Sequence, residues 1–179
     1  MELLSEKKHD TEDKQWWVIE WAKKENLFVN EVCPRLGLNA IMNPAKGTDP
    51  YAHDILVDGK IADLKCQQTP FFKAGDLYNI LSQYAITFNR KDYLRYRKMY
   101  PNIHIFFWVD WQTLEIQIGG KPYKVAPMSG VWKATLPQIK ELIEGGNVPL
   151  HSYKRRQNDV SGNAKNSYIL DLRLLERLC

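Results

Sequence analysis

The chain has 179 residues, of which 44% are hydrophobic and 26% are charged, as in an ordinary soluble domain, and the length fits one domain. No apolar run is long enough to cross a bilayer, and residues 1–14 lack the apolar core of a signal peptide, so we expect a cytoplasmic protein. The 25 Lys and Arg residues against 21 Asp and Glu residues give a net charge of +4, which permits a nucleic-acid partner without requiring one.

The first third of the chain predicts a helix, a strand, a loop and a hairpin. Residues 11–25 have acids in the first turn and lysines in the last, which is typical of a helix. Residues 26–33 predict a strand, and residues 34–52 predict a loop because they hold three prolines and two glycines. Residues 53–67 predict a β-hairpin, since an Asp-Gly pair favours the two-residue type I′ turn.

The remaining elements are a helix, a strand and further additions. Apolar residues at helical spacing predict a long helix over residues 75–98. Residues 102–111 are aromatic and β-branched, as in a buried strand. We then expect a hairpin at 114–126, a short helix at 136–146, and a closing strand or helix at 168–178. This order predicts a single α/β domain over residues 1–179, built as a sandwich around a mixed sheet.

Charges interrupt the two apolar runs of this hairpin, since Asp54 opens the first run and Asp63 and Lys65 lie within the second. If Asp58 and Gly59 form the turn, Asp54 lies directly opposite Asp63, and alternation places Lys65 and Gln67 on the same face. Two carboxylates about 5 Å apart repel by roughly 3 kcal/mol at an effective dielectric near 20. A divalent cation such as Mg²⁺ would turn this repulsion into shared ligation.

The arrangement resembles the PD-(D/E)XK nuclease superfamily, whose fold is restriction-endonuclease-like. The matching features are Asp54 at the start of one strand, a hairpin, and the triplet Asp63-Leu64-Lys65 in the next strand. The resemblance covers roughly residues 11–110, and it implies a mixed β-sheet flanked by helices. Residues 111–179 would then add a β-hairpin and a helix to this core.

The resemblance also implies roles for individual residues. Asp54 and Asp63 would bind Mg²⁺, for which Mn²⁺ should substitute, and Lys65 would orient or deprotonate the attacking water and stabilise charge on phosphorus. Many members add a glutamate from the first helix, for which Glu20 is the nearest match. Several also use a glutamine, here Gln67 or Gln83.

The chain departs from the family pattern in two places. No proline precedes Asp54, and the triplet has aspartate where glutamate is commoner. If the hairpin register were shifted, Asp49 would be the alternative ligand. A zinc site built from Cys33, Cys66 and His53 would match no known ligand spacing, and the three cysteines do not suggest a disulfide framework.

Two basic clusters are candidates for contact with nucleic-acid phosphates. Nearby tyrosines at 93, 96 and 100 could stack on bases or donate hydrogen bonds. The candidate nucleic-acid-binding residues are Arg90, Lys91, Arg95, Arg97, Lys154, Arg155 and Arg156.

The sequence therefore predicts a metal-dependent nuclease that hydrolyses phosphodiester bonds, with DNA favoured over RNA by the resemblance alone. One alternative is a non-catalytic nucleic-acid-binding module of the same fold. Another is an unrelated α/β domain that binds a protein partner through its aromatic residues. The sequence leaves open whether the protein forms a homodimer and whether it cuts inside strands or from their ends.

Overall fold

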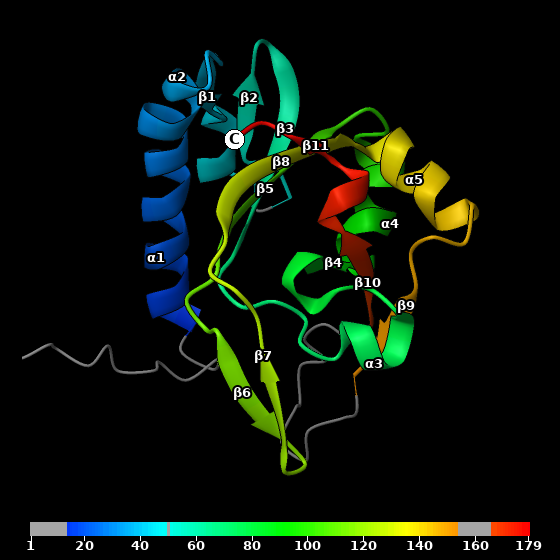
Figure 1. Ribbon diagram of the computed structural model, residues 1–179. Helices are drawn as coiled ribbons and strands as arrows, with labels where there is room; N and C mark the ends of the chain where they lie inside the picture. The colour runs from blue at the N-terminus through cyan, green and yellow to red at the C-terminus, as the bar shows by residue number, and fades with distance from the viewer. Residues whose placement is uncertain (1–13, 50, 154–165) are drawn as a thin grey trace, which may run out of the picture.

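The computed structural model describes residues 14–49, 51–153 and 166–179, and its centre is a six-stranded sheet (Figure 1). Strands β3 and β5 pair in parallel, and every other neighbouring pair is antiparallel. The predicted mixed sheet is therefore confirmed. In spatial order the strands are β1 (Ala40–Met42), β2 (Ile55–Val57), β3 (Lys60–Gln67), β5 (His104–Asp110), β8 (Ser129–Thr135) and β11 (Glu176–Arg177).

Two smaller sheets complete the strand content of the described residues. Strand β10 (Asn166–Asp171) pairs on its two sides with β4 (Ala85–Asn89) and β9 (Leu150–Ser152). Strands β6 (Glu115–Ile118) and β7 (Lys121–Lys124) form the predicted second hairpin, which projects from the body of the molecule in Figure 1.

One face of the central sheet is covered by α1 (Lys14–Leu27), which continues through the π-helical turn η1 (Phe28–Val32) into α2 (Cys33–Arg35). The strand predicted over residues 26–33 is therefore wrong. Phe28, Val29 and Cys33 are buried, and the ring of Phe28 meets the ring of Phe106 edge to face at 5.7 Å. These apolar residues recur at a helical spacing, and packing against the sheet outweighs their β propensity.

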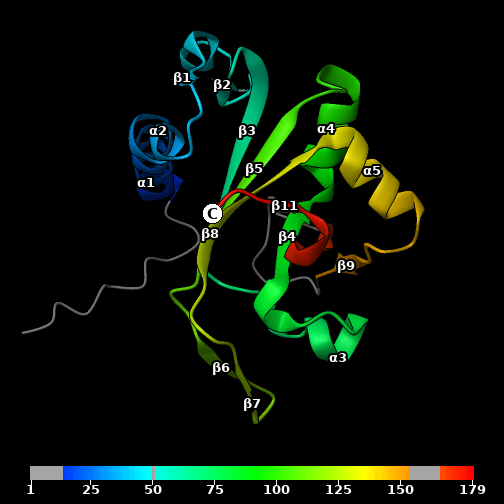
Figure 2. The same cartoon turned by 45° about the horizontal axis from the view of Figure 1, so that its top comes forward.

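The other face is covered by α4 (Arg90–Met99), α5 (Leu136–Glu144) and the three-stranded sheet, so the central sheet lies between two layers (Figure 2). Alternate residues of β5 separate the two cores: Ile105, Phe107 and Val109 pack on the α4 side, and Phe106 packs on the α1 side. Helices therefore flank the sheet as predicted. Among the described residues, no helix is long and apolar enough to span a membrane.

The long helix predicted over residues 75–98 is wrong, because the segment divides into α3 (Ala74–Tyr78), the 3-10 turn η3 (Ser82–Tyr84), β4 and α4. Asn79 adopts a left-handed conformation with φ of 55° and ends α3, which asparagine tolerates better than most residues. Asn89 then caps α4 by accepting a hydrogen bond from the Lys91 amide at 2.9 Å. The apolar residues between Asn79 and Asn89 have spacings that suit a helix and a buried strand equally.

The residues after 110, predicted as additions to the core, instead contribute two strands to the central sheet. Strand β8, which the sequence did not reveal, pairs with β5 inside the central sheet. The predicted helix at 136–146 is confirmed as α5, with a Thr135 capping box. The closing segment forms β10, the turn η4 (Leu172–Leu174) and β11, so it contributes to the three-stranded sheet and to the central sheet.

Candidate active site

The hairpin of β2 and β3 brings two acids together as predicted. Ile55 pairs with Ala62 and Val57 with Lys60, and the turn residues Asp58 and Gly59 have φ of 49° and 74°. Because Ile55 pairs with Ala62, this two-residue turn places Asp54 across from Asp63. The side chains are 17% and 4% exposed, respectively, so water screens their repulsion poorly.

Burial changes the acidity of Asp63. Removal of the carboxylate from water is the largest effect on its pKa, Lys65 opposes it, and the neighbouring Asp54 adds to it. The result is a pKa raised to about 6. Asp63 is thus ionised at neutral pH but holds a proton under mildly acidic conditions.

Lys65 lies between two acids from different elements. Its Nζ is 2.7 Å from Asp63 Oδ2, 2.9 Å from Asp92 Oδ2 and 3.2 Å from Tyr96 Oη. Burial alone would lower the pKa of the ammonium group, but Asp63, Tyr96 and Asp92 outweigh it and raise the pKa well above its usual value. Lys65 is therefore a fixed cation beside the acid pair.

Helix α4 holds this lysine through residues that sequence reasoning did not assign to the site. Asp92 also binds the Arg95 guanidinium, with 3.2 Å between Oδ1 and Nη2. That guanidinium lies over the Tyr96 ring at 5.0 Å and donates to its hydroxyl at 3.3 Å. Asp92 and Tyr96 are four residues apart on one helix face, a spacing that could have drawn attention to them.

The glutamate that α1 contributes near the acids is Glu25 and not the predicted Glu20. Glu20 forms a surface pair with Lys23 at 2.7 Å. Glu25 is only 12% exposed and binds Lys46 Nζ at 2.5 Å, and the same Nζ lies 2.6 Å from Asp54 Oδ1. The two glutamates are five residues apart on one helix, so only the packing of α1 on the sheet distinguishes them.

The other residues proposed from sequence have local structural contacts. Asp49 Oδ1 accepts a hydrogen bond from the Tyr51 amide, and with the hairpin in register it is not needed as an alternative ligand. Gln83 accepts a hydrogen bond from the Trp111 indole through its backbone oxygen. The His53 ring meets Tyr100 edge to face at 5.4 Å, and Cys33 and Cys66 are buried free thiols in the α1 core.

Gln67 shares the face of Lys65, but both ends of its amide bind the backbone of Thr87 in β4. Gln67 Nε2 donates to the Thr87 oxygen at 2.7 Å, and the Thr87 amide donates to Gln67 Oε1 at 3.1 Å. These two bonds link the central sheet to the three-stranded sheet. The catalytic role predicted for Gln67 therefore competes with a structural role.

We expect Gln67→Leu to lower the free energy of unfolding by about 1–3 kcal/mol, because it leaves two partly buried backbone groups without partners. Denaturant unfolding at neutral pH measures this change, and exposed Gln68→Leu serves as the matched control. Nucleic-acid cleavage per folded molecule should stay within about threefold of wild type. A loss of cleavage with unchanged stability would instead support the catalytic role.

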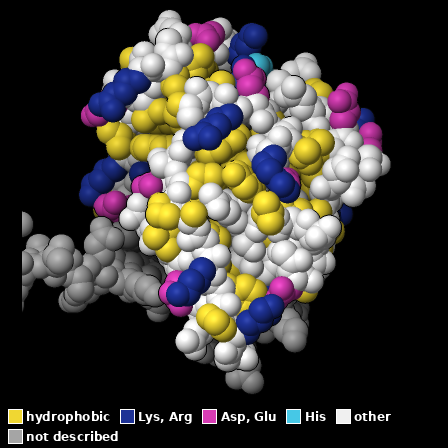
Figure 3. Space-filling model, viewed as in Figure 1, with side chains coloured by type: hydrophobic (Ala, Val, Ile, Leu, Met, Phe, Trp, Pro, Cys, Tyr) yellow, Lys and Arg dark blue, Asp and Glu magenta, His cyan; other side chains and the backbone are white. Residues whose placement is uncertain are grey.

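The predicted nucleic-acid-binding residues of α4 differ in accessibility. Arg90, Lys91 and Arg97 are exposed, whereas Arg95 is partly buried against Tyr96. The view in Figure 3 shows basic, acidic and hydrophobic side chains interspersed on one face, so that face offers no uniform positive surface. Lys154, Arg155 and Arg156 lie outside the described residues.

The acid pair fits a hard divalent cation. Asp63 Oδ2 is buried, and Lys65 Nζ at 2.7 Å is its one close partner within the described structure. Such an oxygen retains lone pairs for a metal. The described ranges contain no group of three side chains that could hold an ion. A cation between Asp54 and Asp63 would therefore complete its shell with water or substrate oxygens, as Mg²⁺ commonly does.

Comparison with known proteins gave one distant structural similarity. No family model matches the chain, and no curated protein matches it. A solved structure of D212, described as a nuclease from a fusselovirus, is 12% identical, with a TM-score of 0.42. The match covers 92% of this chain and 84% of that protein. A similarity this distant does not bear on the candidate site.

Proposed function

We propose that this protein is a metal-dependent nuclease of the PD-(D/E)XK type that hydrolyses phosphodiester bonds, with DNA as its substrate. The observation that carries the proposal is the hairpin register that sets Asp54 opposite Asp63, with Lys65 Nζ 2.7 Å from Asp63. A buried acid and a partly buried acid with a fixed cation beside them are costly for a fold to maintain. Binding a metal and a phosphate at the same point would offset that cost.

Asp54 and Asp63 would hold Mg²⁺, and Mn²⁺ should substitute for it. When bound, the ion supplies a more acidic water as nucleophile and positive charge for the phosphate oxygens. The chain contributes the geometry, since both acids are fixed by a hairpin in a six-stranded sheet. Rigid strands position ligands more reliably than loops do.

Lys65 would act as a cation and not as the base that removes a proton from water. Its raised pKa keeps it charged at neutral pH, and a permanent positive charge suits the negative charge that develops on the phosphate oxygens. Asp92 and Tyr96 position the ammonium group from α4. Of the two roles predicted from sequence, charge stabilisation is therefore the one that we propose.

The substrate proposal rests on the placement of α4. This helix holds Lys65 through Asp92 and also carries exposed Arg90 and Lys91 in its first turn. Basic side chains on the helix that borders the acids could hold the phosphates on either side of the scissile bond. DNA is proposed over RNA from the family resemblance.

Incubation of the full chain with plasmid and short duplex DNA tests the proposal. We expect cleavage with Mg²⁺ or Mn²⁺ and none after treatment with a chelator, because the two acids cannot by themselves lower the pKa of water. Restoration by added Mg²⁺ controls for damage by the chelator. Salt-sensitive DNA binding without cleavage under any divalent ion would favour the non-catalytic alternative, and absence of both would refute a nucleic-acid role.

A further inference from the structure

The two oxygens of Asp54 face different partners. Oδ2 accepts a hydrogen bond at 3.4 Å from the amide of Leu64, the residue that follows Asp63. Oδ1 lies 2.6 Å from Lys46 Nζ. Asp54 therefore borders two positions where a cation can lie, one shared with Asp63 and one shared with Glu25.

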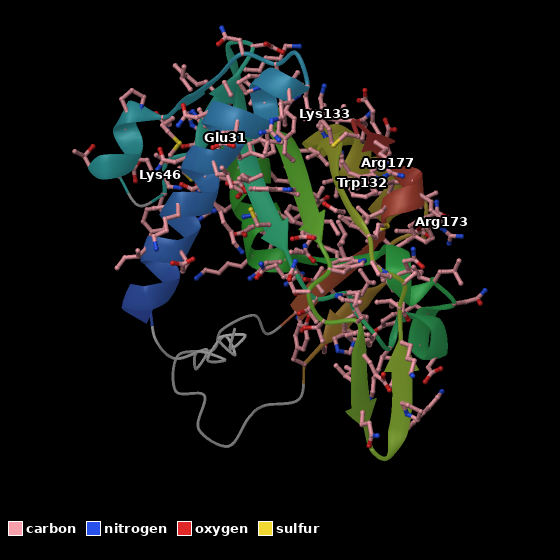
Figure 4. All side chains as sticks on the ribbon, turned by 60° about the vertical axis from the view of Figure 1, so that its left-hand side comes forward. Glu31, Lys46, Trp132, Lys133, Arg173 and Arg177 are labelled. Carbon is pink, nitrogen blue, oxygen red and sulfur yellow. The ribbon has the colours of Figure 1, made fainter. Side chains whose placement is uncertain are left out.

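Lys46 already fills the second position. Its Nζ lies 2.5 Å from Glu25 Oε1 as well as 2.6 Å from Asp54 Oδ1, so one ammonium group joins two carboxylates from separate elements. Glu25 comes from α1 and Asp54 immediately precedes β2. Figure 4 shows Lys46 beside α1. This is the geometry in which a second divalent ion would otherwise bridge the two acids.

The segment that carries Lys46 is anchored to the site. Lys46 belongs to the short 3-10 turn η2 (Pro44–Gly47), which Asn43 caps by accepting a hydrogen bond from the Ala45 amide. Asn43 Nδ2 also donates to the backbone oxygen of His53 at 2.8 Å. The turn is thus tied to the residue just before Asp54, and the lysine is not a freely moving surface side chain.

A charge count favours a single divalent ion. Seven groups are joined by ion pairs of known geometry, four acids (Glu25, Asp54, Asp63 and Asp92) and three cations (Lys46, Lys65 and Arg95), and their net charge is −1 when all are ionised. One divalent ion makes this +1, which one phosphodiester charge neutralises. Two would leave a large positive excess in a partly buried site, which is electrostatically costly.

We propose that the Lys46 ammonium takes the place of a second divalent cation between Glu25 and Asp54, so that the site binds one divalent ion per chain. This inference rests on the proposed function, because it presumes that Asp54 and Asp63 bind a metal. It makes Lys46 a positioning residue, which fixes Asp54 and limits metal occupancy without touching the reacting atoms.

Titration of the full chain with Mn²⁺, followed by electron paramagnetic resonance of the free ion, tests the inference at pH 7.5. We expect one bound ion per wild-type chain and two per Lys46→Met chain, because the variant removes the ammonium group that joins two adjacent carboxylates. Lys121→Met removes a similar lysine–carboxylate pair with Asp76, away from the site, and should still bind one. Two ions in wild type, or one in the variant, would overturn the inference.

A double variant keeps the test valid if Lys46→Met folds poorly. Lys46→Met with Glu25→Gln removes both the cation and one of the acids it separates. We expect it to bind one ion again and to recover the melting temperature lost by the single variant without metal. Failure to return to one ion would contradict the proposed bridge.

The outcomes separate this inference from the proposed function. A change from one ion to two without any nuclease activity would support the role of Lys46 and refute the nuclease. Metal-dependent cleavage by a wild-type chain that binds two ions would refute only the role of Lys46. A chain that binds no Mn²⁺ in either form would refute both.

Discussion

We expect Asp63→Asn to abolish metal-dependent cleavage and to make the metal-free protein more stable. The substitution removes one of two proposed ligands, so cleavage should fall at least about 100-fold, the scale on which losing one key electrostatic group reduces catalysis. It also removes a buried carboxylate whose ionised form is destabilised by loss of hydration. Activity and stability should therefore change in opposite directions.

The stability change should depend on pH in a defined direction. The pKa of Asp63 is raised from 3.8 to about 6, so the folded protein holds this proton more tightly than the unfolded chain does. The associated stability is present below about pH 4 and is lost as pH rises through 6. Asparagine mimics the neutral acid, so the variant should match wild type near pH 4 and exceed it by about 2–3 kcal/mol at pH 7.

Denaturant unfolding with a chelator, repeated from pH 4 to 7, measures this difference. Asp76→Asn is the matched control, because Asp76 is 45% exposed and pairs with Lys121 on the surface. It should leave cleavage unchanged and show no stability gain near pH 6. A variant of Asp63 that retains more than a tenth of wild-type cleavage would contradict the proposed ligand role.

Lys65→Met should remove cleavage while preserving metal binding. The lysine lies 2.7 Å from Asp63 and 2.9 Å from Asp92, so its loss removes the charge proposed to stabilise the phosphate, with an expected effect of about 100- to 1000-fold. Mn²⁺ affinity should stay the same or rise, because a cation next to the ion has been removed. Stability should fall by about 3–5 kcal/mol, since two acids lose their shared partner.

Cleavage assays and Mn²⁺ titration on the same preparation distinguish this role from a merely structural one. Disruption of the fold would lower both readouts together, whereas loss of a catalytic cation should lower only cleavage. Lys23→Met is the control, because Lys23 is 67% exposed and forms an ion pair with Glu20 on the surface of α1. Substantial cleavage by Lys65→Met would rule out the proposed role.

The centre of the candidate site could be predicted because it depends on local rules. An Asp-Gly turn fixes the register of a two-residue hairpin, and side-chain alternation then places Asp54, Asp63 and Lys65 together. The structure has this register. The same counting placed Gln67 on the correct face but could not show that its amide is bound by Thr87, because β4 was hidden in a predicted helix.

Sequence by itself determined the hairpin, the buried strand β5, the β6–β7 hairpin and α5, since each depends on the periodicity and turn residues of one short segment. Tertiary structure decided the rest. Burial against the sheet made residues 28–33 helical and divided residues 75–98 into three elements and a turn. It also chose Glu25 over Glu20, and it brought Asp92 and Lys46 to the acids. The contacts of Glu25 with Lys46 and of Asp92 with Lys65 join residues more than 20 positions apart, and their energies depend on burial that no local pattern encodes.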